Sequence, residues 1–338
     1  MEIVHFYDSE INLKIESKAN IFKVMFDDQI HRFSLEISFV KQILCQLRIF
    51  RRLFRLDKSN AFPIFKNGQL KSVIFIYQFK IYLWDLGSIK QVYELEDCRN
   101  VMHGAITQID SGEIYFGEYG SKRDRTVPVF CSSDYGLTWF KIYEFPAGTT
   151  KHIHNVQWDP YEKKLWICAG DKDGECHILK ADKRFDKVES VGDLSQKWRT
   201  CYFFFEPSFV VWGMDSPLEP CFILKYDRDS EQLKELCKVS GPVWYARRLA
   251  NRGYVVSTSV EPSLYPQDKR ARIYFSHDLH HWVEVFSAKK DIWPYTFKFG
   301  SIFFSAGNEL SSDFYVGFDS VKNLDGKMIP FNELDLKI

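Results

Sequence analysis

The sequence has little of what a membrane-spanning, nucleic-acid-binding or disulfide-bonded protein needs. It contains no long uninterrupted apolar run, which predicts that no segment spans a bilayer. The 338 residues include 45 Lys or Arg and 45 Asp or Glu, so no global basic charge favours a nucleic acid as partner. These absences predict a globular protein whose partner is neither a membrane core nor a nucleic acid.

Two further absences concern the cellular compartment. The eight cysteines contain no C-x-x-C pair, and most lie in strand-like runs, where small buried thiols are usual. The N-terminal stretch MEIVHFYDSE has no basic segment followed by an apolar one, so a secretory signal is not expected. Free thiols without such a signal predict a cytoplasmic protein.

A short segment, CSSDYGLTWF at 131–140, places Ser132, Asp134, Gly136 and Thr138 at alternate positions and ends the pattern with Trp139. An apolar run precedes it and a strand-like run follows, so the segment predicts a hairpin turn. Asp accepts hydrogen bonds from turn N–H groups and Gly takes the positive-φ position. The Trp would anchor the turn on the apolar layer beneath it.

This S-x-D-x-G-x-T-W pattern resembles the Asp-box of sialidases and related β-propellers. In that family the turn joins the third and fourth strands of a blade and serves the fold. The resemblance therefore implies a sialidase-like propeller over about residues 54–320, and it predicts that the turn recurs.

Turn aspartates do recur, with steps of 49, 48, 45, 51 and 41 residues. They are Asp85, Asp134, Asp182, Asp227, Asp278 and Asp319. A degraded copy of the box, SHDLHHW, surrounds Asp278. A second series marks the starts of the first strands: Phe54, His103, His152, Trp198, Trp244 and Trp293. Four strands in each unit of 40–50 residues is typical of a propeller blade.

We therefore predict an all-β fold, a six-bladed β-propeller with four-stranded antiparallel blades, with five or seven blades as alternatives. The propeller is expected to occupy residues 54–338. Residues 1–53 are expected to supply strands and a short helix that pack on the propeller or close it. The basic and apolar run at 40–55 allows peripheral contact with a membrane or partner, or a simple lead into the first blade.

The loops before the first strand and after the second strand of each blade should share one face. Candidate catalytic residues at these positions are His103, His154, Tyr245, Tyr295, Glu118, Asp171, Asp215 and Glu261. Candidate substrate-binding residues are Arg55, His152, Trp198, Arg199, Trp244, Arg247 and Trp293. Glu309 continues the acidic series. Aromatic faces, cations and carboxylates around one pocket suit an acidic sugar ring.

The resemblance to sialidases implies a glycoside hydrolase acting on an acidic or nucleotide-linked saccharide, with Arg55, Arg199 and Arg247 near the sugar carboxylate. An alternative is a polysaccharide or oligosaccharide lyase that uses His or Tyr as the base. A second alternative is a propeller that binds glycans or proteins without catalysis.

No cofactor is predicted. No metal is assigned, although His152 and His154, one residue apart on a strand, could bind one together with His103. The expected partner is a saccharide substrate, with no nucleic acid and no transmembrane segment. The sequence does not indicate an oligomeric state.

Overall fold

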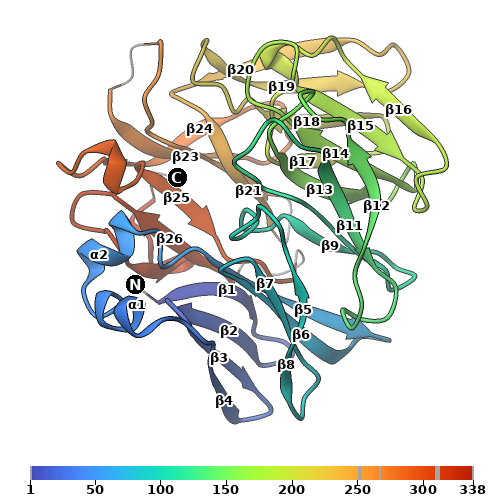
Figure 1. Ribbon diagram of the computed structural model, residues 1–338. Coiled ribbons are helices and arrows are strands. Elements are labelled where there is room, and N and C mark those ends of the chain that lie inside the picture. The colour runs from blue at the N-terminus through green and yellow to red at the C-terminus, as the bar shows by residue number, and fades with distance from the viewer. Residues whose placement is uncertain (1, 250–252, 266–267, 309–312, 337–338) are drawn as a thin grey trace. The chain divides into compact units, whose positions relative to one another are not determined.

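The computed structural model describes residues 2–249, 253–265, 268–308 and 313–336. These residues form seven antiparallel sheets, six of four strands and one of three (Figure 1). The β-propeller class is confirmed. The prediction of six blades is wrong, because the sheets number seven in the part of the chain that is described.

The sheets follow one another along the chain, and within each sheet the neighbouring strands are consecutive in sequence. The first two are β1 (Ile3–Asp8), β2 (Leu13–Lys18), β3 (Ile21–Phe26), β4 (Gln29–Ser34), and β5 (Ser59–Lys66), β6 (Gln69–Tyr77), β7 (Lys80–Trp84), β8 (Ile89–Glu94). The next two are β9 (Ile106–Gln108), β10 (Ile114–Gly117), β11 (Val127–Ser132), β12 (Phe140–Phe145), and β13 (Ile153–Asp159), β14 (Lys164–Ala169), β15 (His177–Ala181), β16 (Val188–Val191).

The last three sheets complete the series. They are β17 (Phe203–Phe205), β18 (Phe209–Gly213), β19 (Cys221–Asp227), β20 (Leu233–Val239), then β21 (Val243–Leu249), β22 (Gly253–Thr258), β23 (Arg270–Ser276), β24 (Val283–Lys289), and β25 (Ser301–Phe304), β26 (Tyr315–Asp319), β27 (Met328–Pro330). The helices are α1 (Phe39–Leu44) and α2 (Arg48–Leu53), with 3₁₀ turns η1 (Gln196–Trp198), η2 (Tyr295–Phe297) and η3 (Phe331–Glu333).

The blade that does not follow the sequence repeat is the first sheet, β1–β4. Helices α1 and α2 lie between it and β5, so this blade falls out of phase with the spacing of 41–51 residues that links the later turns. Its hairpin between β3 and β4 also lacks the box pattern, with Asp27 and Asp28 both at positive φ. Residues 1–53 were expected to pack on the propeller or close it, but their described part contains one of its sheets and the helices α1 and α2.

The last sheet departs from the repeat at its start. The chain from Trp293 was expected to form a first strand, but it forms η2 instead. A single bridge between Val260 and Gly300 is the only strand-like pairing recorded before β25 in the described part of this segment. The sheet therefore begins with β25, which corresponds to the second strand of the other blades.

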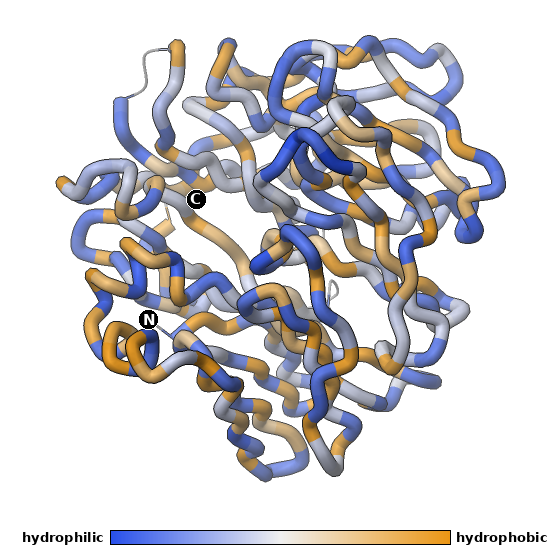
Figure 2. Tube along the Cα trace, in the orientation of Figure 1, coloured by the Kyte–Doolittle hydropathy of each residue, from blue (hydrophilic) through white to orange (hydrophobic). Residues whose placement is uncertain are grey.

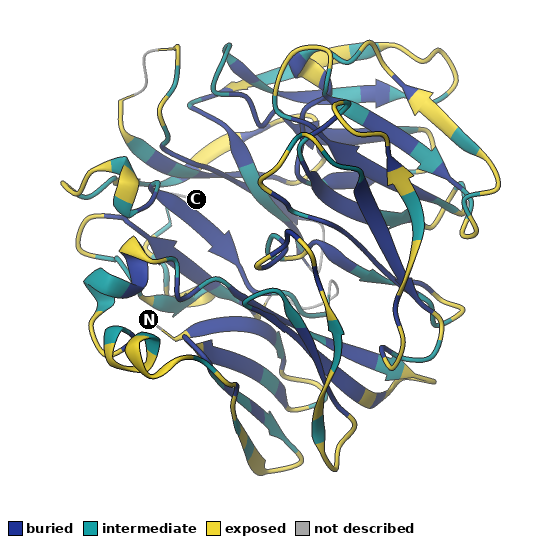
Figure 3. Cartoon of the chain, viewed as in Figure 1, coloured by how far each residue is buried: buried dark blue, intermediate teal, exposed yellow. Residues whose placement is uncertain are grey.

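The chain divides into two compact units, one comprising residues 1–59, 217–224 and 235–338 and the other comprising 60–216 and 225–234. In each unit the inner strands are the most deeply buried elements. All residues of β10 and β22 are buried, whereas the outer strands β8 and β12 consist mostly of exposed and half-buried residues (Figure 3). Such continuous apolar strands indicate sheets covered on both faces.

The Asp134 turn forms the hydrogen bonds that its sequence pattern predicts. Asp134 accepts from Ser132 Oγ at 2.9 Å and from the backbone N–H and Oγ1 of Thr138 at 2.9 and 2.6 Å. Gly136 has φ of +89°, and Trp139 Nε1 donates to its carbonyl at 3.1 Å. The turn is therefore closed by both the carboxylate and the buried indole.

Four other turn aspartates occupy the same connection between the third and fourth strands of their sheets. Asp278 accepts from the N–H groups of His280 and His281, although its box lacks the Gly and Thr. The others accept from N–H groups two to five residues ahead, and they are Asp85, Asp182 and Asp227.

Asp319 behaves differently from the other five. Its carboxylate is buried and pairs with Arg48 and Lys298. The N–H of Ser320 instead donates to Asp325 at 2.8 Å. Because α2 places Arg48 next to Asp319, this aspartate forms an ion pair, and Asp325 accepts the hydrogen bond from the turn N–H instead.

Exposed apolar side chains lie on α1 and beside α2, and Figure 2 shows hydrophobic stretches interleaved with hydrophilic ones along this segment. Phe39, Val40, Ile43 and Leu47 are all more than half exposed. In the described residues no helix has the length and apolar character needed to cross a membrane.

Candidate functional site

Five of the predicted site residues lie together in the unit that contains residues 60–216. We call this group the histidine–aspartate cluster, and its members are His152, His154, Asp171, Arg199 and Asp215. Each lies just before a first strand, on a first strand, or just after a second strand of the sheets β13–β16 and β17–β20. The strand ends bring these side chains to one place.

The two histidines are positioned by a bulge at the start of β13. The pairing of β13 with β14 shifts register between Ile153 and Asn155, so His154 is the extra residue. A β-bulge re-aims the side chains around it. Here it allows His152 and His154 to approach each other, with their Nε2 atoms 3.1 Å apart.

Asp171 reaches the histidines because Gly170 permits a sharp turn after β14. Gly170 has φ of +97°, and a Cβ there would lie 1.7 Å from the carbonyl oxygen of Glu175. Its N–H donates to the carbonyl of His152 at 3.2 Å. Any other residue would displace this connection and the carboxylate that follows it.

Each imidazole is oriented by a backbone carbonyl. Nδ1 of His152 lies 3.1 Å from the carbonyl of Gly120, and Nδ1 of His154 lies 2.9 Å from that of Thr200. A carbonyl only accepts hydrogen bonds, so both Nδ1 atoms carry a proton, and each ring in its neutral form presents a lone pair at Nε2. Asp171 Oδ1 faces these lone pairs at 3.2 and 3.5 Å.

Arg199 joins the two carboxylates of the cluster. Its Nη2 lies 3.2 Å from Asp171 Oδ1, and its Nε lies 3.3 Å from Asp215 Oδ2. Arg199 Nη1 also donates to the backbone carbonyl of Asp171 at 2.8 Å. Lys151 Nζ approaches Asp171 Oδ2 at 3.9 Å. Charge-assisted bonds of this kind fix the orientation of both carboxylates.

Burial and pairing shift the pKa values of the cluster. Burial lowers the pKa of His152, because the charged imidazolium would lose its water. Burial alone would raise the pKa of Asp171, but its interactions with His152 and His154 outweigh burial and hold the pKa well below its usual range. The cluster thus contains a firmly ionised carboxylate beside a histidine that favours its neutral form.

Two neighbours of the cluster were not among the predicted site residues. The ring of Tyr119 stacks on His152 with centroids 4.2 Å apart. Cys201 lies with Sγ 3.4 Å from Asp215 and 3.7 Å from His154 Nδ1, and burial raises its pKa well above the usual value. Tyr119 shares with Glu118 the predicted position just after a second strand, whereas Cys201 follows the predicted Arg199 by two positions.

Other predicted residues of the same unit have different surroundings. Glu118 is buried, with Arg125 at 3.1 Å and the N–H of Asp97 at 3.2 Å, and burial raises its pKa. Trp198 packs on Trp212 and lines a separate hollow of about 280 Å³. His103 lies half-buried in the turn before β9.

The remaining predicted residues belong to the other unit. Three of them gather around Phe299: the Arg55 guanidinium lies 6.0 Å from its ring centroid, and the rings of Trp244 and Tyr295 both lie 5.9 Å from it. Trp293 packs on Phe297 with centroids 5.3 Å apart. These contacts make an aromatic cluster with two cations beside it, Arg55 at Phe299 and Lys290 over the Tyr295 ring.

Arg247 is buried and bonded within the protein. Its Nη1 donates to the carbonyl of Ser305 at 2.7 Å, its Nη2 donates to that of Asn308 at 3.1 Å, and it lies over the Phe314 ring. Tyr245 packs edge-on against Trp244 and Phe303, and Glu261 is half-buried after β22. Glu309 lies outside the described residues. That all these residues line one funnel stays a prediction.

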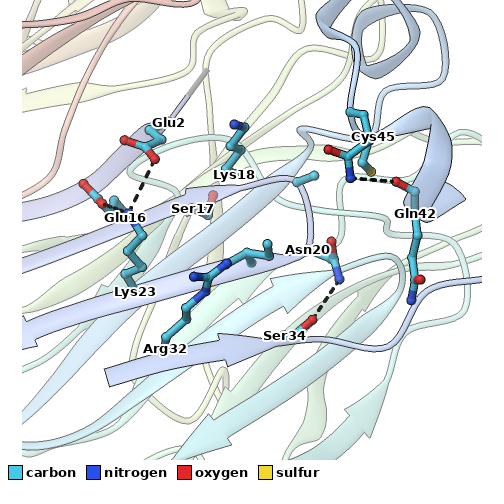
Figure 4. Close-up of a pocket in the computed structure, with 13 residues that line it drawn as sticks. Glu2, Glu16, Ser17, Lys18, Asn20, Lys23, Arg32, Ser34, Gln42 and Cys45 are labelled. Carbon is cyan, nitrogen blue, oxygen red and sulfur yellow. Dashed lines mark hydrogen bonds and ion pairs between the residues drawn. The ribbon is translucent and has the colours of Figure 1, made fainter. Parts of the chain in front are cut away.

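A pocket of about 600 Å³ lies between the first sheet and α1. Lys23 bridges Glu2 and Glu16 at its edge, and Lys18 and Arg32 also line it (Figure 4). Burial opposes ionisation of Glu16, but the bonds from Lys23 and the charge of Lys14 hold its pKa below the usual value. None of the predicted site residues lines this pocket.

No protein-family model matches the chain, and no curated protein matches its sequence. Among solved structures, a protein described as a TolB from Agrobacterium tumefaciens is similar to this chain. The two share 12% sequence identity with a TM-score of 0.44, over 68% of this chain and 88% of that chain.

Proposed function

We propose that the protein is a carbohydrate-active enzyme of the sialidase-like superfamily that acts on an acidic saccharide and cleaves it by β-elimination. The observation that carries the proposal is the histidine–aspartate cluster. It combines electron-pair donors at His152, His154 and Asp171 with the positive charges of Arg199 and Lys151. The sugar is expected to approach from the side of Asp171, the most exposed of the three donors.

Elimination from a uronic acid needs two elements that this cluster provides. A cationic group stabilises the sugar carboxylate while a base takes the proton from the adjacent carbon. The electron pair of the broken C–H bond then forms a C=C bond while the C–O bond to the leaving sugar breaks. The leaving oxygen takes up a proton. No oxidant or reductant is required.

Hydrolysis fits the described residues less well. A glycosidase needs a carboxylic acid of raised pKa beside a second carboxylate, both open to the sugar. Glu118 has a raised pKa but is 1% exposed and bonded to Arg125. Asp171 is accessible, but its pKa is lowered. For this reason we place the lyase reaction ahead of the hydrolase reaction.

The test is incubation of the purified protein with uronic-acid oligosaccharides, with sialosides and nucleotide sugars in parallel. Ultraviolet absorbance reports an unsaturated uronic acid, and a reducing-end assay reports cleavage by either route. We expect both signals to rise together on the uronic-acid substrates. Asp171→Asn should lower kcat/KM by about 100-fold or more, because the variant lacks the one carboxylate that faces both histidines.

His280→Gln is the matched control, since His280 is an exposed histidine of the Asp278 turn. Its activity should equal that of the wild type. Reducing ends without absorbance would identify a hydrolase instead. Lack of any product from all three substrate classes would leave a non-catalytic, ligand-binding propeller as the better interpretation.

A further inference from the structure

Three atoms of the histidine–aspartate cluster present lone pairs to one another. They are Nε2 of His152, Nε2 of His154 and Oδ1 of Asp171, separated by 3.1, 3.2 and 3.5 Å. Since both Nδ1 atoms donate to carbonyls, rings in the neutral form have no proton to place between the two Nε2 atoms, and the three ligand atoms form a set that could hold a metal ion. We propose that His152, His154 and Asp171 bind a divalent transition-metal ion.

The separations agree with coordination to one ion. Metal–nitrogen distances of 2.0–2.1 Å and metal–oxygen distances of 2.0–2.2 Å at tetrahedral angles place ligand atoms about 3.3 Å apart. The three observed separations lie within about 0.2 Å of that value. The atoms therefore need little movement to receive the ion.

The surrounding hydrogen bonds are those that metal ligands usually have. A metal-binding histidine commonly donates its other ring N–H to a carbonyl, which holds the ring in place. His152 and His154 do so with Gly120 and Thr200. Arg199 similarly holds the carboxylate of Asp171.

The charges are also compatible with a bound cation. The guanidinium of Arg199 contacts Asp215 as well as Asp171, so Asp215 compensates its charge. Asp171 then remains to offset part of the charge of the metal. Two imidazoles and one carboxylate suit zinc, manganese, iron, cobalt or nickel better than calcium or magnesium, which prefer oxygen ligands alone.

A second possible ligand set, His154, Cys201 and Asp215, uses the opposite nitrogen of His154. This nitrogen, Nδ1, donates to Thr200 and has no lone pair to offer. The first set is therefore the metal site, and Cys201 lies outside it. This distinction provides a matched control.

The role of the metal rests on the proposed function, whereas its binding does not. With three protein ligands, coordination positions remain for a sugar carboxylate on the side of Asp171. The cation would then take over the charge neutralisation assigned above to Arg199 and Lys151. The proton acceptor would be a group other than the two histidines, and Tyr119, which stacks on His152, is one candidate.

The test uses the full chain, treated with chelator and titrated with Co²⁺ or Mn²⁺ alone. Calorimetry should give one ion per chain, and Co²⁺ should develop visible absorption bands. Asp171→Asn should weaken Co²⁺ binding by at least 10-fold, while Cys201→Ser should bind it like the wild type. Pulsed electron paramagnetic resonance of the Mn²⁺-loaded wild type should detect histidine nitrogens, a measurement that needs no variant.

Absence of stoichiometric binding, equal affinity of Asp171→Asn and wild type, or lack of nitrogen coupling would each overturn the metal site. Loss of binding in Cys201→Ser would also overturn it, in favour of the second ligand set. Full elimination activity of the chelated protein would refute the role of the metal but keep the proposed function. A bound ion without product from any saccharide would keep the metal site but refute the proposed function.

Discussion

Replacing Asp134 by Ala tests whether the box-like turn stabilises the fold. The carboxylate accepts three hydrogen bonds, one from Ser132 and two from Thr138, at 2.6–2.9 Å. A typical intramolecular hydrogen bond contributes about 0.5–1.5 kcal/mol, and the half-buried site reduces the total. We expect Asp134→Ala to lower the free energy of unfolding by about 1–3 kcal/mol and to leave the histidine–aspartate cluster unchanged.

The loss should depend on pH in a defined direction. Burial opposes ionisation of Asp134, but bonds from Thr138 and Ser132 outweigh it and lower the pKa. A lowered pKa in the folded state means that the carboxylate stabilises the protein fully above its unfolded pKa of about 4. The contribution then disappears as pH falls through the lower folded value. The difference in the free energy of unfolding between wild type and Asp134→Ala should therefore shrink below about pH 4.

Urea unfolding followed by circular dichroism at pH 7 and in acid measures both effects. Asp85→Ala is the control, because Asp85 accepts only two backbone N–H bonds and is fully exposed. Its loss should be clearly smaller. Equal losses for the two variants, or a loss for Asp134→Ala that grows on acidification, would refute the argument.

Two further predictions concern other parts of the chain. Arg247→Lys should lower stability by about 1–3 kcal/mol, since a lysine cannot reach both carbonyls and also cover Phe314. Thermal unfolding measures this loss of stability. Calorimetry with a uronic acid and with a neutral sugar tests the predicted role of Arg247 in binding acidic ligands. That role requires the variant to bind the uronic acid more weakly and the neutral sugar equally well. If residues 40–55 contact a membrane, Val40→Ser with Ile43→Ser should reduce co-sedimentation with anionic vesicles, because both side chains are exposed. Unchanged sedimentation would contradict that contact.

The candidate site shows how far strand spacing can predict proximity. The sequence placed His152, His154, Asp171, Arg199 and Asp215 at corresponding positions of two successive repeats, and the structure brings these five side chains together. It could not indicate that both Nδ1 atoms donate to carbonyls, because Gly120 and Thr200 come from other parts of the chain. That orientation is what makes the metal proposal possible.

By itself, the sequence determined the all-β propeller class and the positions of five turn aspartates, because strand alternation and turn chemistry are local properties repeated along the chain. Only the tertiary structure decided the number of blades. The first blade has the same strand pattern, but α1 and α2 separate it from the others and shift it out of phase. The tertiary structure also decided the partners of Asp319, since Arg48 lies 271 residues away in sequence and meets it only after folding. Long-range pairing of this kind leaves no period in the sequence.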